Sequence, residues 1–173
     1  MKVLISDYSL ELLGLESTEE EIFFDLNEEK IKNCLGCFRC WVKTPGYCVL
    51  RDDACDIYPC VAHSDHIVYV SRLLYGSYDA PIKRLLERSL PTQQAFLRQY
   101  KGETHHVQRN VKSKTASFIV YGWQNEEEQR LFQELVRANS KNMLLEEWHI
   151  YFVQENEVPE AIKEEVQRWN DYL

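Results

Sequence analysis

The chain has 173 residues, of which 45% are apolar and 28% charged, and its formal net charge at pH 7 is -8. That length fits one domain of roughly 100–200 residues, so we expect a single domain over residues 1–173. An acidic chain is a poor match for nucleic acid, whose phosphates bind clustered Lys and Arg, and we expect no nucleic-acid partner. The mean hydropathy is -0.45 and no run approaches the ~20 apolar residues that span a bilayer, so we expect no membrane partner.

The first residues indicate the compartment. Met1-Lys2 leads directly into the run Val3-Leu-Ile5, which is too short for the apolar region of a secretory signal. We therefore expect a cytoplasmic protein. Structural disulfides are rare in the cytoplasm, so clustered cysteines in this chain favour metal or redox roles.

Apolar runs rich in β-branched and aromatic residues alternate with helical patterns along the chain. In chain order we expect strands over 2–6 and 21–26, a helix from Asp52 or Asp53 toward Ala62, a strand over 65–71, a helix over 78–88, a strand over 115–122, a helix from Asn125, a strand over 146–153 and a helix from Pro159. Asp79 is the expected N-cap of the second of these helices, and three acids follow Asn125 at the positive end of the third.

This alternation determines the expected architecture. Strands that alternate with helices predict parallel pairing, and hence a three-layer α/β sandwich around a five-stranded, doubly wound sheet. Ligands of such sheets bind beyond the carboxyl ends of the strands. One basic stretch, Arg98 to Lys114, falls outside these elements, and we interpret it as a solvated loop, with an anion-binding or partner-binding surface as the alternative.

All six cysteines lie between residues 34 and 60. The first four, Cys34, Cys37, Cys40 and Cys48, form a C-x2-C-x2-C-x7-C pattern. An iron–sulfur cluster needs about four converging thiolates, and this spacing lets one loop supply them. A structural zinc site, a thiol redox pair and a set of inert buried cysteines are the alternatives. Cys55 and Cys60 fall on the expected helix after the pattern, and we interpret them as core residues.

The chain also resembles a known family over residues 31–91. The matching stretches are Ile31 to Cys40, Gly46 to Asp53, Ser64 to Val68 and Ser71 to Arg88. In order and spacing they are similar to the iron–sulfur flavoprotein branch of the NAD(P)H-dependent FMN reductases, which have a flavodoxin-like fold. The resemblance thus implies a flavodoxin-like sheet and a redox protein that transfers electrons through FMN and a 4Fe-4S cluster.

The resemblance also implies site residues and partners. The loop after the third strand would lie against the flavin ring, and the loop after the fourth would border the same pocket. These positions are Arg72, Leu73, Leu74, Tyr75 and Gly76, then Tyr121, Gly122 and Trp123. Cys34, Cys37, Cys40 and Cys48 would hold the cluster. NAD(P)H or a protein would be the redox partner, and the chain would form a homo-oligomer, typically a dimer.

The first loop departs from the family pattern. Family members follow their first strand with a Gly-Ser and Gly-Asn-Thr type of loop that holds the FMN phosphate at a helix N-terminus. Residues 6–20 have no arginine and no Gly-Asn-Thr, and Asp7 would repel a phosphate. The segment is also about half the family's length, so we expect a shortened first crossover. The departure supports a second hypothesis, a family member without flavin that acts as an interaction or regulatory protein or holds a cluster alone. A third, a small zinc-stabilised binding protein, has only the thiols in its support.

Two basic residues of the matching segment need a separate interpretation. Lys83 and Arg88 have the charge of functional residues but match positions on a helix. We therefore expect them to have structural or interface roles.

Overall fold

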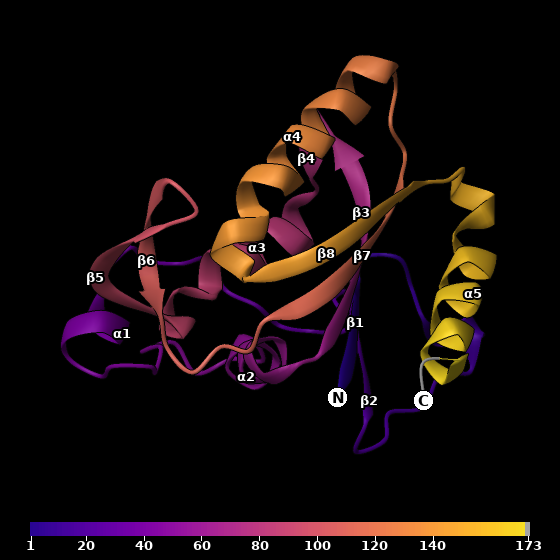
Figure 1. Ribbon diagram of the computed structural model, residues 1–173. Coiled ribbons are helices and arrows are strands. Elements are labelled where there is room, and N and C mark those ends of the chain that lie inside the picture. Colours follow the sequence, from indigo (N-terminus) through magenta and orange to yellow (C-terminus); the bar gives the residue numbers. More distant parts are fainter. Residues whose placement is uncertain (172–173) are drawn as a thin grey trace.

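The computed structural model describes residues 1–171, and five parallel strands form its central sheet (Figure 1). These strands are β1 (Lys2–Ser6), β2 (Glu21–Asp25), β3 (His66–Leu74), β7 (Lys114–Tyr121) and β8 (Leu145–Phe152). Their spatial order is β2-β1-β3-β7-β8, which is the flavodoxin-like order of a doubly wound sheet. The predicted fold class is confirmed, and each predicted strand lies within a few residues of an observed one.

The inner strands of the sheet are buried on both faces because they are largely apolar. In β1, Val3 and Ile5 belong to one core and Leu4 belongs to the other. β1 pairs with β3 in register, so that Leu4 lies opposite Val68 and Ile5 opposite Tyr69. The same alternation continues into β7, which places one core on each side of the sheet.

Three helices cover the first face, namely α2 (Ala54–His63), α3 (Ala80–Arg88) and α4 (Glu126–Met143) (Figure 1). Their ends follow the predicted caps: the Asp79 carboxylate accepts a hydrogen bond from the Ala80 N–H, and the Asn125 side chain accepts one from the Glu128 N–H. A short strand, β4 (Ser77–Tyr78), pairs antiparallel with the end of β3.

The second face is covered by α5 (Val158–Asp171), whose Val158, Ile162 and Trp169 are buried. Between β1 and β2 the chain forms only a single 3-10 turn, η1 (Glu11–Leu13), so the predicted shortening of the first crossover is confirmed. Leu10 is buried in the same core, and the ring of Phe23 stacks on Trp169 at 5.8 Å. These side chains fill part of the space that a crossover helix would otherwise occupy.

The basic stretch is not a solvated loop, and that expectation was wrong. β5 (Gln93–Tyr100) and β6 (Glu103–Gln108) form an antiparallel hairpin outside the main sheet. It lies beside α1 (Arg39–Val42), where the ring of Trp41 contacts that of His106 at 4.7 Å. Two further 3-10 turns, η2 (Leu90–Thr92) and η3 (Glu155–Glu157), complete the elements. In the part of the chain that the structure describes, no helix combines the length and apolarity needed to cross a membrane.

Candidate functional site

Two regions carry the residues that the sequence singled out, and the first is the carboxyl edge of the sheet. Here the carboxylate of Asp7, directly after β1, accepts hydrogen bonds from two other strand ends. The Arg72 N–H donates to its two oxygens at 3.0 and 2.9 Å, and the Ser71 hydroxyl donates at 3.1 Å. The Tyr121 hydroxyl of β7 donates at 2.9 Å. One side chain of the first loop thus joins three strand ends.

The same environment shifts the ionisation of Asp7. Burial raises the pKa of Asp7 to about 6, although the hydrogen bonds from Arg72, Tyr121 and Ser71 act in the opposite direction. Asp7 is therefore mostly ionised at neutral pH, and its carboxylate uses donors that an external anion would need at this edge.

The predicted loop after the third strand is mostly strand, which corrects its assignment. β3 continues through Arg72, Leu73 and Leu74 because its end pairs with β4. Only Tyr75 and Gly76 remain as a two-residue turn, with φ of 54° and 74°. Positive φ at both residues is the hallmark of a type I′ hairpin turn.

The residues predicted to border a flavin ring do not form one surface. Leu73 and Gly76 are buried, whereas 45% of Leu74 and 85% of Tyr75 are exposed. The Arg72 side chain lies against Gly122, where an added Cβ would be 2.9 Å from its Cγ. Trp123 is half-buried and packs against the core on the first face of the sheet. The structure thus brings together Arg72, Tyr121 and Gly122, and it directs the other five positions elsewhere.

The phosphate end of an FMN site does not fit this chain. The η1 turn has three residues and no buried ones, so it offers no helix N-terminus like those that bind phosphate. Asp7 adds a carboxylate where a phosphate group would bring further negative charge. We therefore derive no chemical step through FMN at this edge.

The second region is the cysteine segment between β2 and α2. All four predicted ligands are free thiols: Cys40 is buried, Cys34 and Cys48 are half-buried, and Cys37 is exposed. Burial raises the pKa of Cys40, and the charges of Cys48, Cys34 and Cys37 raise it further. The charges of the other three thiols thus act on Cys40, and all four thiols lie on the same segment.

Local backbone conformation helps to shape this segment. Gly36 and Phe38 both have positive φ, 60° and 52°, which turns the chain twice between Cys34 and Cys40. The Gly36 N–H points to the Cys34 sulfur at 3.5 Å. Backbone donors aimed at sulfur are one of the features that tune iron–sulfur centres.

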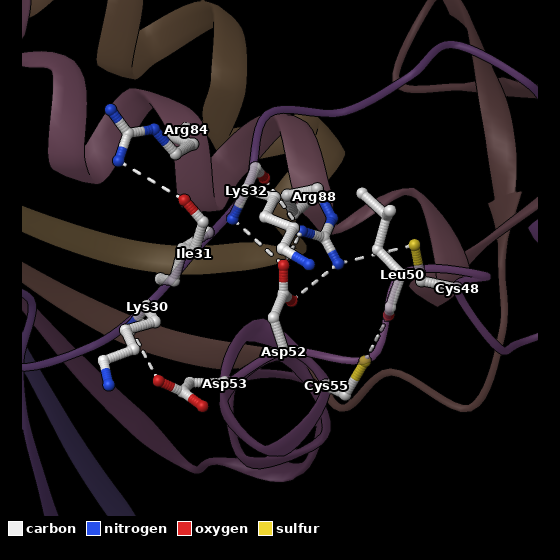
Figure 2. A network of polar contacts seen from close by, with 10 residues as sticks. All are labelled: Lys30, Ile31, Lys32, Cys48, Leu50, Asp52, Asp53, Cys55, Arg84 and Arg88. Carbon is white, nitrogen blue, oxygen red and sulfur yellow. Dashed lines mark hydrogen bonds and ion pairs between the residues drawn. The ribbon is translucent and has the colours of Figure 1, made fainter.

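A buried ion pair fastens the segment to α3 (Figure 2). Arg88 and Asp52 are 0% and 4% exposed, and two hydrogen bonds of 2.7 and 2.9 Å join them. Burial alone would raise the pKa of Asp52, but the hydrogen bonds from Arg88 and from the Lys32 N–H outweigh it and lower the pKa below its usual value. Arg88 therefore has a structural role, as we expected from its place on a helix.

The donor set suits a metal in kind but is not closed around one. Four thiols are the ligand set of an iron–sulfur cluster or a structural zinc ion. Within residues 1–171, however, no three His, Cys, Asp or Glu side chains are grouped closely enough to hold a metal ion. The four cysteines therefore fit a cluster by the chemistry of their thiols and by their spacing in the sequence, but the described structure does not group them around one point.

Cys55 and Cys60 differ from these four. The Cys55 thiol donates to the Leu50 carbonyl at 3.1 Å, and the Cys60 thiol donates to the Asp56 carbonyl at 3.3 Å. Both side chains pack against the core on the face covered by α2, α3 and α4. Their interpretation as core residues agrees with this packing.

Sequence reasoning missed the bridging roles of two acids. Asp7 was noted only as a charge unfavourable to phosphate, and Asp52 only as a helix cap, whereas the cap position before α2 is held by Asp53. No local signal pointed to Asp52, because its partner Arg88 is 36 residues further along the chain. Two cavities of about 220 and 820 Å³ lie near the amino end of the sheet, away from both regions.

The strand order and the helix layers define a flavodoxin-like protein. No protein-family model matches the chain. Over 88 residues it is 31% identical to an iron-sulfur flavoprotein of Methanocaldococcus jannaschii, a match that covers 51% of this chain and 44% of that protein. Over 66 residues it is 35% identical to an iron-sulfur flavoprotein of Archaeoglobus fulgidus, covering 38% and 29%. The predicted resemblance is confirmed, and the matches span less than half the length of these relatives.

Solved structures support the fold over nearly the whole chain. A protein of Streptococcus mutans has a TM-score of 0.62 at 12% identity, with full coverage of both chains. An NAD(P)H:quinone oxidoreductase of Methanothermobacter marburgensis has a TM-score of 0.54 at 11% identity, covering 93% of this chain and 89% of that one. An FMN-dependent NADH-azoreductase of Bacillus anthracis, solved with FMN, has a TM-score of 0.54 at 13% identity, covering 94% and 92%. At these identities the likeness establishes the fold.

Proposed function

We propose that this chain is a flavodoxin-like redox protein in which Cys34, Cys37, Cys40 and Cys48 hold a 4Fe-4S cluster. The gathering of four unpaired thiols in one segment carries the proposal. Similarity to two iron-sulfur flavoproteins supports it. When bound, such a cluster supplies one-electron transfer. NAD(P)H or a protein is the proposed redox partner, as in the reductases with the same fold.

The residues of the segment have distinct roles in this proposal. Cys40, the buried thiol, lies on α1 and is fixed by the helix. Cys37 is exposed, so its side of the cluster would face solvent or a partner. The Gly36 N–H would donate to the sulfur of Cys34, and Arg88 would donate to that of Cys48.

Anaerobic purification with iron and zinc analysis tests the ligand assignment. We expect about four irons per chain and a broad visible absorption in the reconstituted wild-type protein. Cys37→Ala should lose the absorption, whereas the matched control Cys60→Ala should keep it. Full iron content in Cys37→Ala, or zinc in place of iron, would contradict the proposal.

Exposed apolar side chains around the cysteine segment support a partner surface. Leu35, Phe38, Val42 and Tyr47 are all exposed there. Exposed apolar side chains in one area are typical of interaction sites. We propose that this surface forms the interface of a homodimer. Light scattering should give a dimer mass for the wild type and a monomer mass for Val42→Glu. A dimer mass for both proteins would contradict the proposal.

Flavin binding distinguishes two candidates, a redox protein that also binds FMN and a cluster-bearing protein without flavin. The carboxyl edge favours the second, because the Asp7 carboxylate takes the donors of Arg72, Ser71 and Tyr121. Titration with FMN and with riboflavin separates the two candidates. A flavoprotein should bind FMN more tightly than riboflavin, because it recognises the phosphate. Failure to bind either flavin, with iron content intact, would favour the second candidate.

A further inference from the structure

A buried lysine lines the smaller of the two cavities near the amino end of the sheet. Lys114 begins β7 and is 3% exposed. Its ammonium donates to the Lys112 carbonyl at 2.5 Å and to the Ala62 carbonyl, near the end of α2, at 3.5 Å. Lys114 and Ala62 both line the cavity, whose volume is about 220 Å³. The charged end of a buried side chain therefore lies beside an internal space.

No carboxylate is paired with this charge. Among the ion pairs of residues 1–171, none involves Lys114, although a buried ammonium ordinarily has an acidic partner. The Asp65 carboxylate, which acts on it through charge alone, pairs instead with Lys112 and the amino terminus. Burial lowers the pKa of Lys114 to about 8, so the amine is still protonated at neutral pH. An ammonium has three N–H donors, and the two carbonyls leave one of them for a ligand.

A second donor lines the same cavity. Tyr69 of β3 is 2% exposed, and its ring stacks on that of Phe118 at 5.6 Å, which fixes its direction. Its hydroxyl has no hydrogen-bond partner in the part of the chain that the structure describes. Buried hydroxyl groups are normally hydrogen-bonded, so one without a partner at the wall of a cavity indicates a ligand. The rest of the wall is mixed, with apolar Val61, Leu86 and Met143 and the amides of Gln93 and Asn139.

We propose that this cavity binds a small organic monocarboxylate, with Lys114 as its ionic anchor and Tyr69 as a hydrogen-bond donor. A carboxylate supplies the missing counter-charge and has two oxygens, which can accept from both donors. An apolar cavity of about 150 Å³ holds benzene, so this one has room for a ring that carries a carboxyl group. The site is independent of the proposed redox function, because none of the cysteines lines the cavity.

Isothermal titration with benzoate and butanoate tests the proposal, and benzamide and butanamide are uncharged controls of the same shape. At about pH 6.5 the wild type should bind each acid about tenfold more tightly than its amide, because only the acid pairs with the ammonium. Lys114→Met keeps the length of the side chain and should remove this preference. Lys112→Met is the matched control, since it removes an exposed lysine two residues away, and it should keep the preference.

Two further measurements leave the lysine in place. Tyr69→Phe removes only the hydroxyl and should weaken the binding of acid and amide alike by about fivefold. Raising the pH of the wild type to about 9 should weaken acid binding about tenfold, because Lys114 then loses its proton, and should leave amide binding unchanged. Asp65 and Lys112 are the other charged groups that act on Lys114, so Lys112→Met is titrated in parallel and should give the same pH profile.

The outcomes decide between a ligand site and a structural lysine. Equal affinities of the wild type for acid and amide, or no binding of either, would overturn the proposal and leave Lys114 as a cap on the end of α2. An equal loss in Lys112→Met and Lys114→Met would also overturn it, because the effect would then belong to the overall charge of the chain. Near-UV circular dichroism shows whether Lys114→Met folds. If it does not, Tyr69→Phe and the pH profile of the wild type decide the question.

Discussion

The two regions at the predicted site satisfy their polar groups in opposite ways. At the carboxyl edge, Asp7 joins three strand ends through its own carboxylate, and the donors there are already used. In the cysteine segment, Arg88 and Asp52 satisfy each other, and the four thiols form no disulfide. The first region is complete without a ligand, whereas the second has a rigid frame around reactive groups. One fold thus satisfies its polar groups internally in one region and leaves thiols without a disulfide partner in another.

The largest effect should come from breaking the frame of the cysteine segment. Arg88→Ala leaves the Asp52 carboxylate buried without its partner, and breaking such a pair costs about 3–5 kcal/mol. Urea denaturation should show that loss in the free energy of unfolding. Arg88→Met/Asp52→Leu should recover much of it, because no unpaired charge remains. Equal stabilities of Arg88→Ala and wild type would show that the frame is not held by this pair.

A second test uses the pH dependence of the carboxyl edge. Burial raises the pKa of Asp7 from 3.8 to about 6, so the folded carboxyl holds its proton more tightly than the unfolded one. The contribution of Asp7 to the free energy of unfolding is therefore most favourable below the pKa of the unfolded state. It is lost as the pH rises through the pKa of the folded state, and the total loss is about 3 kcal/mol.

Asp7→Asn removes this titration. Between about pH 4 and about pH 7 we expect the free energy of unfolding of Asp7→Asn to rise relative to wild type by that amount. Taking the difference between the two proteins at each pH cancels the other carboxyl groups. A constant difference across the range would show that Asp7 is not desolvated, and the contrast between the two regions would weaken.

The turn at the end of β3 offers a smaller effect. Gly76 has φ of 74°, and an added Cβ would lie 2.7 Å from the Leu131 Cβ of α4. Gly76→Ala should cost about 1–3 kcal/mol from backbone strain and the clash. Gly102→Ala is the control, because Gly102 has φ of 82° but open space around it. If Gly76→Ala and Gly102→Ala lose the same stability in thermal unfolding, the whole cost comes from backbone strain and none from the clash with α4.

The smallest expected effect is at the outer side of the cysteine segment. The Trp41 indole N–H donates to the Leu90 carbonyl at 2.9 Å, which ties α1 to the chain after α3. Trp41→Phe keeps most of the ring and should cost about 1 kcal/mol of the free energy of unfolding. Iron content should stay unchanged, since the thiols are not touched. A complete loss of iron would mean that the indole, and not Arg88, frames the segment.

Much of the fold could be read from the sequence because its strands and caps are local signals. Continuous apolar runs gave five strands, and Asp79 and Asn125 marked two helix starts that the structure confirms. The β5–β6 hairpin was missed because its residues are largely polar and basic, and its stability depends on packing such as that of Trp41 on His106. Pairing of that kind between distant segments has no signature in a single stretch of sequence.

The site was less predictable than the fold. The cysteine spacing located the segment, because its chemistry lies in residue type and separation. The capture of Arg72, Ser71 and Tyr121 donors by Asp7 depends on three strand ends that meet only in the folded sheet. The extension of β3 through Leu74 depends on pairing with β4, which shortened the predicted loop to a turn.

The coverage of one face of the sheet by α5 has a consequence for biosynthesis. The ribosome completes β1, β3 and β7 before it reaches residue 158, so the side chains of Leu4, Val68 and Ile119 lack most of their cover until α5 emerges. A nascent sheet with one bare apolar face is prone to aggregate. Without a helix in the first crossover, most of that face stays bare until the segment after residue 158 has been made.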